Sequence, residues 1–284
     1  MSDTISWREL WDDTARLHSR VHARWLCEEA CGAWDEEFDD VLEQPVTERS
    51  VAHLDAMLAR LRNGEPLQYV LGHWSFRHLD LLVDDRVLIP RPETEWVAGV
   101  AIDAARQQPR PVRCADLGTG SGAIGLSLLH ELPRGSSEVW LTDASPDALD
   151  VARANNAGIG INGAGARFAH GSWYDALPAD LAGTFGVVAA NPPYIADGDP
   201  AVDPSVHEWE PGMALYAGSD GLSALRMIVG GAPHWLQPGG WLVLEIGTGQ
   251  GESVAALFED AGLVDVQVQP DLAGHDRVVI GRRP

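Results

Sequence analysis

The chain has 284 residues, with 42 acidic residues against 20 basic ones and a formal net charge of −22. All 20 basic residues are arginines, and they form no local basic patch, so the acidic surface disfavours a duplex nucleic-acid substrate. A basic protein partner fits better, while an acidic proteome or a solubility adaptation explains the charge equally well.

This length suffices for two domains with a sizeable core. The three cysteines make no even disulfide framework, and no signal peptide or long apolar span is present. We therefore expect a cytoplasmic protein without a membrane partner. Cys27 and Cys31 lie four residues apart on an expected helix but lack a second ligand pair, which favours plain helix packing over a metal site.

Residues 1–75 are predicted to form a small helical bundle. Ser6 and Glu9 have the spacing of a capping box, and Thr47 opens a second apolar helical pattern that stops at Asn63. The acidic run at 35–40 is typical of a solvated helix face, with docking of a basic partner as the sharper alternative.

Residues 76–92 predict a β-hairpin that links the bundle to the rest of the chain. Apolar residues alternate on both sides of a turn-like Asp84-Asp85 pair. The prolines that follow end the second strand, and Pro92 is placed to begin the next helix.

From residue 93 to residue 284 the pattern alternates strand and helix, which predicts a doubly wound α/β sheet. The expected strands are 112–117, 137–143, 166–171, 185–191, 239–246, 263–269 and 276–281. The expected helices are 122–131, 146–157, 220–235 and 250–261.

The first of these strands ends in the stretch Asp116-Leu117-Gly118-Thr119-Gly120-Ser121-Gly122. Glycines at the carboxyl end of a first strand allow backbone to lie against a ligand. The spacing differs from that of dinucleotide binders, and Asp116 suits an ammonium group better than a pyrophosphate. The next strand ends at Asp143, where an acid accepts both ribose hydroxyls, although a cap or turn before Pro146 is the alternative. Together these features indicate S-adenosyl-L-methionine.

Two further features follow strands. The glycine cluster Gly247-Thr248-Gly249-Gln250-Gly251 has no acid at ribose distance after it, so we interpret it as a tight strand-to-helix turn. Trp173 offers an aromatic face for adenine and is equally compatible with a place in the core.

The stretch Asn191-Pro192-Pro193-Tyr194 follows an apolar run and ends it abruptly. Its two prolines contribute no backbone N–H and fix the backbone, so the Asn191 side chain and the Pro192 carbonyl form a rigid, acceptor-rich corner. Such a corner suits a ligand that presents an NH2 group. A simple turn after a strand is the alternative.

Taken together, four stretches resemble the protein-(glutamine-N5) methyltransferases that act on peptide-chain release factors, and the resemblance covers the whole chain. The stretches are Pro90-Arg91-Pro92-Glu93-Thr94-Glu95, the glycine stretch at 116–122, Asn191-Pro192-Pro193-Tyr194 and Asp276-Arg277-Val278-Val279. Asn-Pro-Pro-Tyr alone is shared with DNA adenine-N6 methyltransferases, so the first stretch and the helical domain support the narrower assignment.

The resemblance implies a seven-stranded Rossmann-like sheet with an antiparallel last strand, S-adenosyl-L-methionine as methyl donor, and the glutamine of a Gly-Gly-Gln loop as acceptor. Carried over by position, Gly118 to Gly122 line the cofactor, Asp143 takes the ribose, Trp173 packs on adenine, and Asn191 to Tyr194 hold the glutamine. Ser172 departs from the family pattern, which has an acid before the tryptophan.

An amide is a weak nucleophile, so catalysis is expected to consist mostly of positioning. Hydrogen bonds from the glutamine NH2 to Asn191 and Pro192 orient it, and the ring of Tyr194 faces the cationic sulfonium. Two alternatives stay open: an adenine-N6 methyltransferase on nucleic acid, and a cofactor-binding regulator without turnover.

Overall fold

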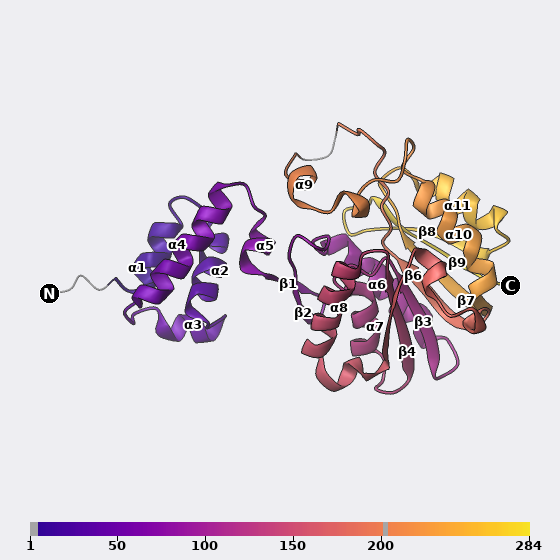
Figure 1. The fold of residues 1–284 in the computed structure, drawn as a ribbon, viewed down its shortest axis with the longest axis horizontal. Helices are drawn as coiled ribbons and strands as arrows, with labels where there is room; N and C mark the ends of the chain where they lie inside the picture. The colour runs from indigo at the N-terminus through magenta and orange to yellow at the C-terminus, as the bar shows by residue number, and fades with distance from the viewer. Residues whose placement is uncertain (1–4, 201–203) are drawn as a thin grey trace. The chain divides into compact units, whose positions relative to one another are not determined.

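The computed structural model describes residues 5–200 and 204–284, drawn in Figure 1. The chain divides into two compact units, Met1–Gly72 and His73–Pro284. The division falls three residues before the expected boundary at 75, and the first four residues of the predicted bundle lie outside the described part of the chain.

The first unit is helical. Its elements are α1 (Trp7–Thr14), α2 (Arg20–Cys31), α3 (Glu36–Val41), α4 (Glu48–Arg62) and α5 (Leu67–Leu71). The capping box at Ser6 and Glu9 is formed, and the Thr47 hydroxyl caps α4. Trp7 and Trp11 both pack edge-on against the buried ring of Phe38, which holds α1 and α3 together.

The second unit begins with a hairpin that lies earlier than predicted. Its strands are β1 (His73–Phe76) and β2 (Leu79–Leu82), so Asp84-Asp85 is not the hairpin turn. A separate turn does begin at Asp84, whose carbonyl accepts a hydrogen bond from the Val87 N–H at 3.1 Å. The chain turns at Arg77, which has a φ of 54° and donates two hydrogen bonds to the Glu131 carboxylate. A partly buried ion pair with a residue distant in sequence holds this turn, so the local sequence carries no turn signal for it.

A seven-stranded sheet in the order β5-β4-β3-β6-β7-β9-β8 forms the centre of this unit. Only β9 runs against its neighbours, so the expected antiparallel last strand is confirmed. The strands are β3 (Val112–Leu117), β4 (Ser137–Asp143), β5 (Ala166–His170), β6 (Phe185–Ala190), β7 (Leu236–Glu245), β8 (Val264–Pro270) and β9 (Asp276–Arg282).

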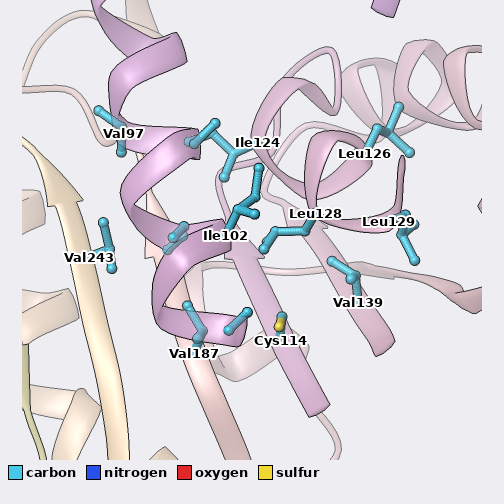
Figure 2. Packing of buried hydrophobic residues seen from close by; sticks show 14 of the residues in the cluster. Val97, Ile102, Cys114, Ile124, Leu126, Leu128, Leu129, Val139, Val187 and Val243 are labelled. Atoms are coloured by element: carbon cyan, nitrogen blue, oxygen red, sulfur yellow. The ribbon is translucent and has the colours of Figure 1, made fainter. Parts of the chain in front are cut away.

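Helices cover both faces of the sheet, as Figure 1 shows, because successive strand residues point to opposite sides. On one face Cys114, Val187 and Val243 pack under α6 and α7, and Figure 2 shows this cluster. On the other face their neighbours, such as Val188 and Leu242, pack under α10 and α11. The helices are α6 (Pro92–Arg106), α7 (Ala123–Glu131), α8 (Pro146–Gly158), α9 (Pro204–Trp209), α10 (Ser223–Trp235) and α11 (Gly251–Asp260).

The strand order reverses between β3 and β6, because the chain passes from β3 outward to β5 and then returns to pair β6 with β3. In open α/β sheets this switch point, at the carboxyl ends of the strands, is where ligands bind. Among the described residues no helix is long and apolar enough to cross a membrane.

Candidate active site

A cavity of about 220 Å³ opens at the switch point. It brings together most of the residues that the sequence singled out, although they come from the ends of four different strands. Those that line it are Asp116, Gly118, Thr119, Gly120, Ser121, Asp143, Trp173, Asn191 and Pro193. Ser172, the departure from the family pattern, also lines it.

The glycine loop after β3 is ordered by Asp116, which is fully buried. Its Oδ2 accepts hydrogen bonds from the Thr119 hydroxyl (2.5 Å) and from the backbone N–H of Gly125 (2.8 Å). Burial raises the pKa of this carboxyl to about 6, and the two hydrogen bonds oppose the rise. Asp116 therefore ties the loop to the start of α7 as well as facing the cavity.

Two glycines of the loop are required for different reasons. Gly118 has a φ of 71°, and a Cβ there would lie 3.2 Å from the ring of Trp173, so the ring and the loop are in contact. Gly122 has a φ of 91°, and a Cβ there would approach Leu126 to 2.8 Å. Gly122 is absent from the residues that line the cavity, so packing against α7 explains it.

Asp143 lies at the end of β4 with both carboxylate oxygens in use. Oδ2 accepts from the Gly120 N–H (2.9 Å) and Oδ1 from the Ser145 N–H (2.8 Å). Burial raises the pKa of this carboxyl. Each oxygen keeps a further lone pair, so Asp143 is able to accept hydroxyl donors in the cavity. The cap before Pro146 is Ser145, not Asp143.

A second cavity of about 200 Å³ lies beside the first. Pro192 and Tyr194 line it, together with apolar side chains of Leu88, Ile195, Val206 and Leu215. Asn191 lines both cavities. The predicted corner is thus the place where the two spaces meet.

Asn191 is linked by hydrogen bonds to a buried carboxylate that the sequence analysis did not identify. Its Nδ2 lies 3.2 Å from Thr94 Oγ1, and the Thr94 hydroxyl donates to Glu245 Oε2 at 2.7 Å. The Tyr194 hydroxyl donates to the other oxygen of Glu245 at 3.3 Å. Glu245 is completely buried at the end of β7, and burial raises its pKa to about 7.

The Pro-Arg-Pro-Glu-Thr-Glu stretch lies against both cavities. Pro90 lines the first, Arg91 lines the second, and Thr94 contacts Asn191. Arg91 also pairs with the buried carboxylate of Glu210, which accepts a second bond from the Ile89 N–H at 3.1 Å. This pair anchors the segment after α9 beside the second cavity.

The second glycine cluster makes a tight turn into α11, as predicted. No residue of the cluster is found among the described residues that line either cavity. Gln250 instead braces the corner, since its Nε2 donates to the Tyr194 carbonyl (3.0 Å) and its Oε1 accepts from the Gly247 N–H (2.9 Å).

Comparisons with known proteins identify the family to which the chain is similar. The model of the methyltransferase small domain matches residues 103–207, and that of the PrmC N-terminal domain matches residues 14–72. The chain is 42% identical to the release factor glutamine methyltransferase of Xylella fastidiosa, over 84% of each chain. It is 37% identical to the protein of the same name in Geobacter sulfurreducens, over 93% of this chain and 90% of the relative.

Two solved structures are similar to parts of the chain. A T. thermophilus 16S rRNA methyltransferase in complex with AdoMet and guanosine is 16% identical, with a TM-score of 0.50, over 75% of this chain and 50% of that chain. A release factor-specific protein-(glutamine-N5) methyltransferase from Alicyclobacillus acidocaldarius is 28% identical, with a TM-score of 0.42, over 69% of this chain and 94% of that chain.

Proposed function

The chain belongs to the release factor glutamine methyltransferases, and on that premise we propose that it methylates the side-chain amide nitrogen of the glutamine in the Gly-Gly-Gln motif of release factors. The methyl donor is S-adenosyl-L-methionine. The observation that carries the proposal is the position of Asn191, an amide side chain at the junction of two adjacent cavities.

The first cavity suits the methyl donor. Asp143 offers free lone pairs at the end of β4 for the ribose hydroxyls, and the Trp173 ring provides an apolar face for adenine. At Gly120 nothing lies within 4 Å of the position of a Cβ, so the loop backbone is open to a ligand. Asp116, ionised above a pH of about 6, supplies negative charge for the ammonium group.

The second cavity suits the glutamine. The Asn191 side-chain oxygen and the Pro192 carbonyl accept the two N–H donors of the amide and orient its nitrogen toward the first cavity. Leu88, Ile195 and Leu215 give this cavity apolar walls beside the amide. S-adenosyl-L-methionine, when bound, supplies an electrophilic methyl group on a sulfonium. No covalent nucleophile is required from the protein, because the site acts by positioning two reactants.

The helical unit is proposed to dock the release factor. Its acidic α3, with Glu36, Glu37 and Asp39 in the first turn, offers a surface for a basic protein. The hairpin at 73–82 is part of the catalytic unit, since Phe76, Leu79 and Leu81 belong to its core.

Methyl transfer from labelled cofactor tests the function. A purified release factor, its Gly-Gly-Ala variant and a DNA duplex are offered in parallel. We expect label only on the Gly-Gly-Gln protein. Label on the duplex would favour an adenine-N6 methyltransferase, and cofactor binding without any transfer would favour a regulator.

A further inference from the structure

The Asn191 amide has two possible orientations, and only one of them serves the proposed reaction. With its oxygen toward the second cavity it accepts an N–H donor of glutamine, whereas with its NH2 there two donors would face each other. A rigid backbone does not choose between these orientations, because they differ by rotation about a side-chain bond. Something else must fix the amide.

When Glu245 is ionised, the buried partners of Asn191 form a series of hydrogen bonds with only one possible direction. An ionised carboxylate only accepts, so the single hydroxyl hydrogen of Thr94 goes to Glu245, 2.7 Å away. Thr94 Oγ1 then has only lone pairs left for Asn191, and the atom 3.2 Å from it must be the NH2 nitrogen. The Asn191 oxygen is thereby turned away from Thr94.

These hydrogen bonds are shielded from solvent by burial. Thr94 is 4% exposed and Glu245 is completely buried, so bulk water does not replace either partner. The Tyr194 hydroxyl donates to the second oxygen of Glu245, so the same carboxylate holds both ends of the Asn191-Pro192-Pro193-Tyr194 corner. Arg277, on β9, lies close enough to favour the charged form of Glu245, while Glu93 opposes it.

We propose that Thr94 and Glu245 are positioning residues that fix the orientation of the Asn191 amide so that its oxygen faces the glutamine. This inference rests on the proposed function. It assigns a role to the threonine of the Pro-Arg-Pro-Glu-Thr-Glu stretch and to the acid at the end of β7. Thr94 lines the first cavity, and Glu245 lines neither cavity.

The test removes the Thr94 hydroxyl with little change of shape. Thr94→Val is expected to lower kcat by about tenfold or more, since one buried hydrogen bond to the amide is lost. Thr94→Ser is expected to restore most of kcat because it returns the hydroxyl. Thr184→Val is the matched control. Thr184 accepts a hydrogen bond from Arg113 and lies just before the first residue of β6, at the end of that strand opposite Asn191. Assays at about pH 8.5 keep Glu245 ionised.

A double-mutant cycle separates positioning from general structural damage. In an Asn191→Ala background the amide is gone, so Thr94→Val should lower kcat no further. An equal loss in both backgrounds, or a Thr94→Val enzyme with wild-type kcat, would overturn the inference. If the valine variant does not fold, Thr94→Ala carries the same test. A wild-type enzyme that methylates no release factor would instead refute the proposed function.

Discussion

At the scale of single residues, the site depends on polar groups buried at strand ends. Asp116 at the end of β3, Asp143 at the end of β4 and Glu245 at the end of β7 all have a raised pKa because burial disfavours their charged forms. Asp116 and Asp143 line the first cavity, and perturbed carboxyl groups at a cavity are typical of functional sites. Burying each of these carboxyl groups lowers the free energy of unfolding, and other interactions of the fold must offset this loss.

The cost at Glu245 predicts a pH dependence of stability. Folded Glu245 holds its proton up to about pH 7, whereas an unfolded glutamate loses it near 4.5, so the free energy of unfolding falls as pH rises across this window. Glu245→Gln does not titrate and should lack this component, which amounts to at most about 3 kcal/mol. Urea unfolding of both proteins at about pH 5 and pH 8 measures it. Parallel pH profiles would contradict the burial argument.

Asp143 predicts a loss of cofactor affinity. Asp143→Asn keeps the shape and one acceptor oxygen, but it loses the charge and places an NH2 group against the Gly120 or Ser145 N–H, so binding of S-adenosyl-L-methionine should weaken by about tenfold or more. Asp147→Asn makes the same charge change on the exposed first turn of α8 and should alter the affinity by less than about twofold. Calorimetry compares the two variants. Equal affinities of the two variants for S-adenosyl-L-methionine would show that Asp143 does not bind the cofactor.

At the scale of elements, one ion pair holds the segment after α9 to the strand-to-helix connection before α6. The Glu210 side chain is 2% exposed and has Arg91 and the Ile89 N–H as partners. This segment supplies Ala214 and Leu215 to the wall of the second cavity. We therefore expect the ion pair to affect binding of the release factor.

Arg91→Met removes the cation and leaves a buried carboxylate with one backbone donor. We expect it to cost about 1 to 3 kcal/mol of stability and to raise the KM for the release factor. Arg106→Met removes the cation of an exposed pair with Asp103 and should cost less than about 1 kcal/mol. Denaturant unfolding and steady-state kinetics provide the two readouts. Arg91→Met kinetics equal to wild type would show that the anchor is dispensable.

Elements with strong local signals were predictable from the sequence. The alternation of apolar runs with helical patterns located every strand of the large sheet within a few residues, and Pro92 began α6 as expected. The hairpin turn was misplaced because Arg77 is held in its conformation by Glu131, a residue 54 positions away. The roles of Thr94 and Glu245 were not predicted either, because their hydrogen bond joins α6 to β7, which are far apart in the sequence.

A signal for Glu245 was nevertheless present. It is an acid inside the apolar run Leu242-Val243-Leu244-Glu245-Ile246, and charged residues are rarely buried without a partner. What the sequence lacked was the identity of that partner. Only the fold brings Thr94 and Tyr194 to the same carboxylate and Asn191 to Thr94.

At the scale of the whole molecule, the two compact units divide the proposed work. The cofactor cavity and the corner at Asn191 belong entirely to His73–Pro284. A protein lacking residues 1–72 should therefore bind S-adenosyl-L-methionine with near wild-type affinity but methylate an intact release factor poorly, mainly through a higher KM. Calorimetry and steady-state kinetics on the truncated and full-length proteins measure this. Full activity of the truncated protein would exclude docking by the helical unit.

The central claim is that the corner at Asn191 selects an amide by accepting its two N–H donors. The most direct measurement is the rate of methyl transfer by the wild-type protein to a Gly-Gly-Gln release factor and to its Gly-Gly-Glu variant. A carboxylate offers no donor and faces two oxygens, so the account predicts at least about 10⁴-fold discrimination against the glutamate variant. Comparable methylation of the two proteins would contradict it.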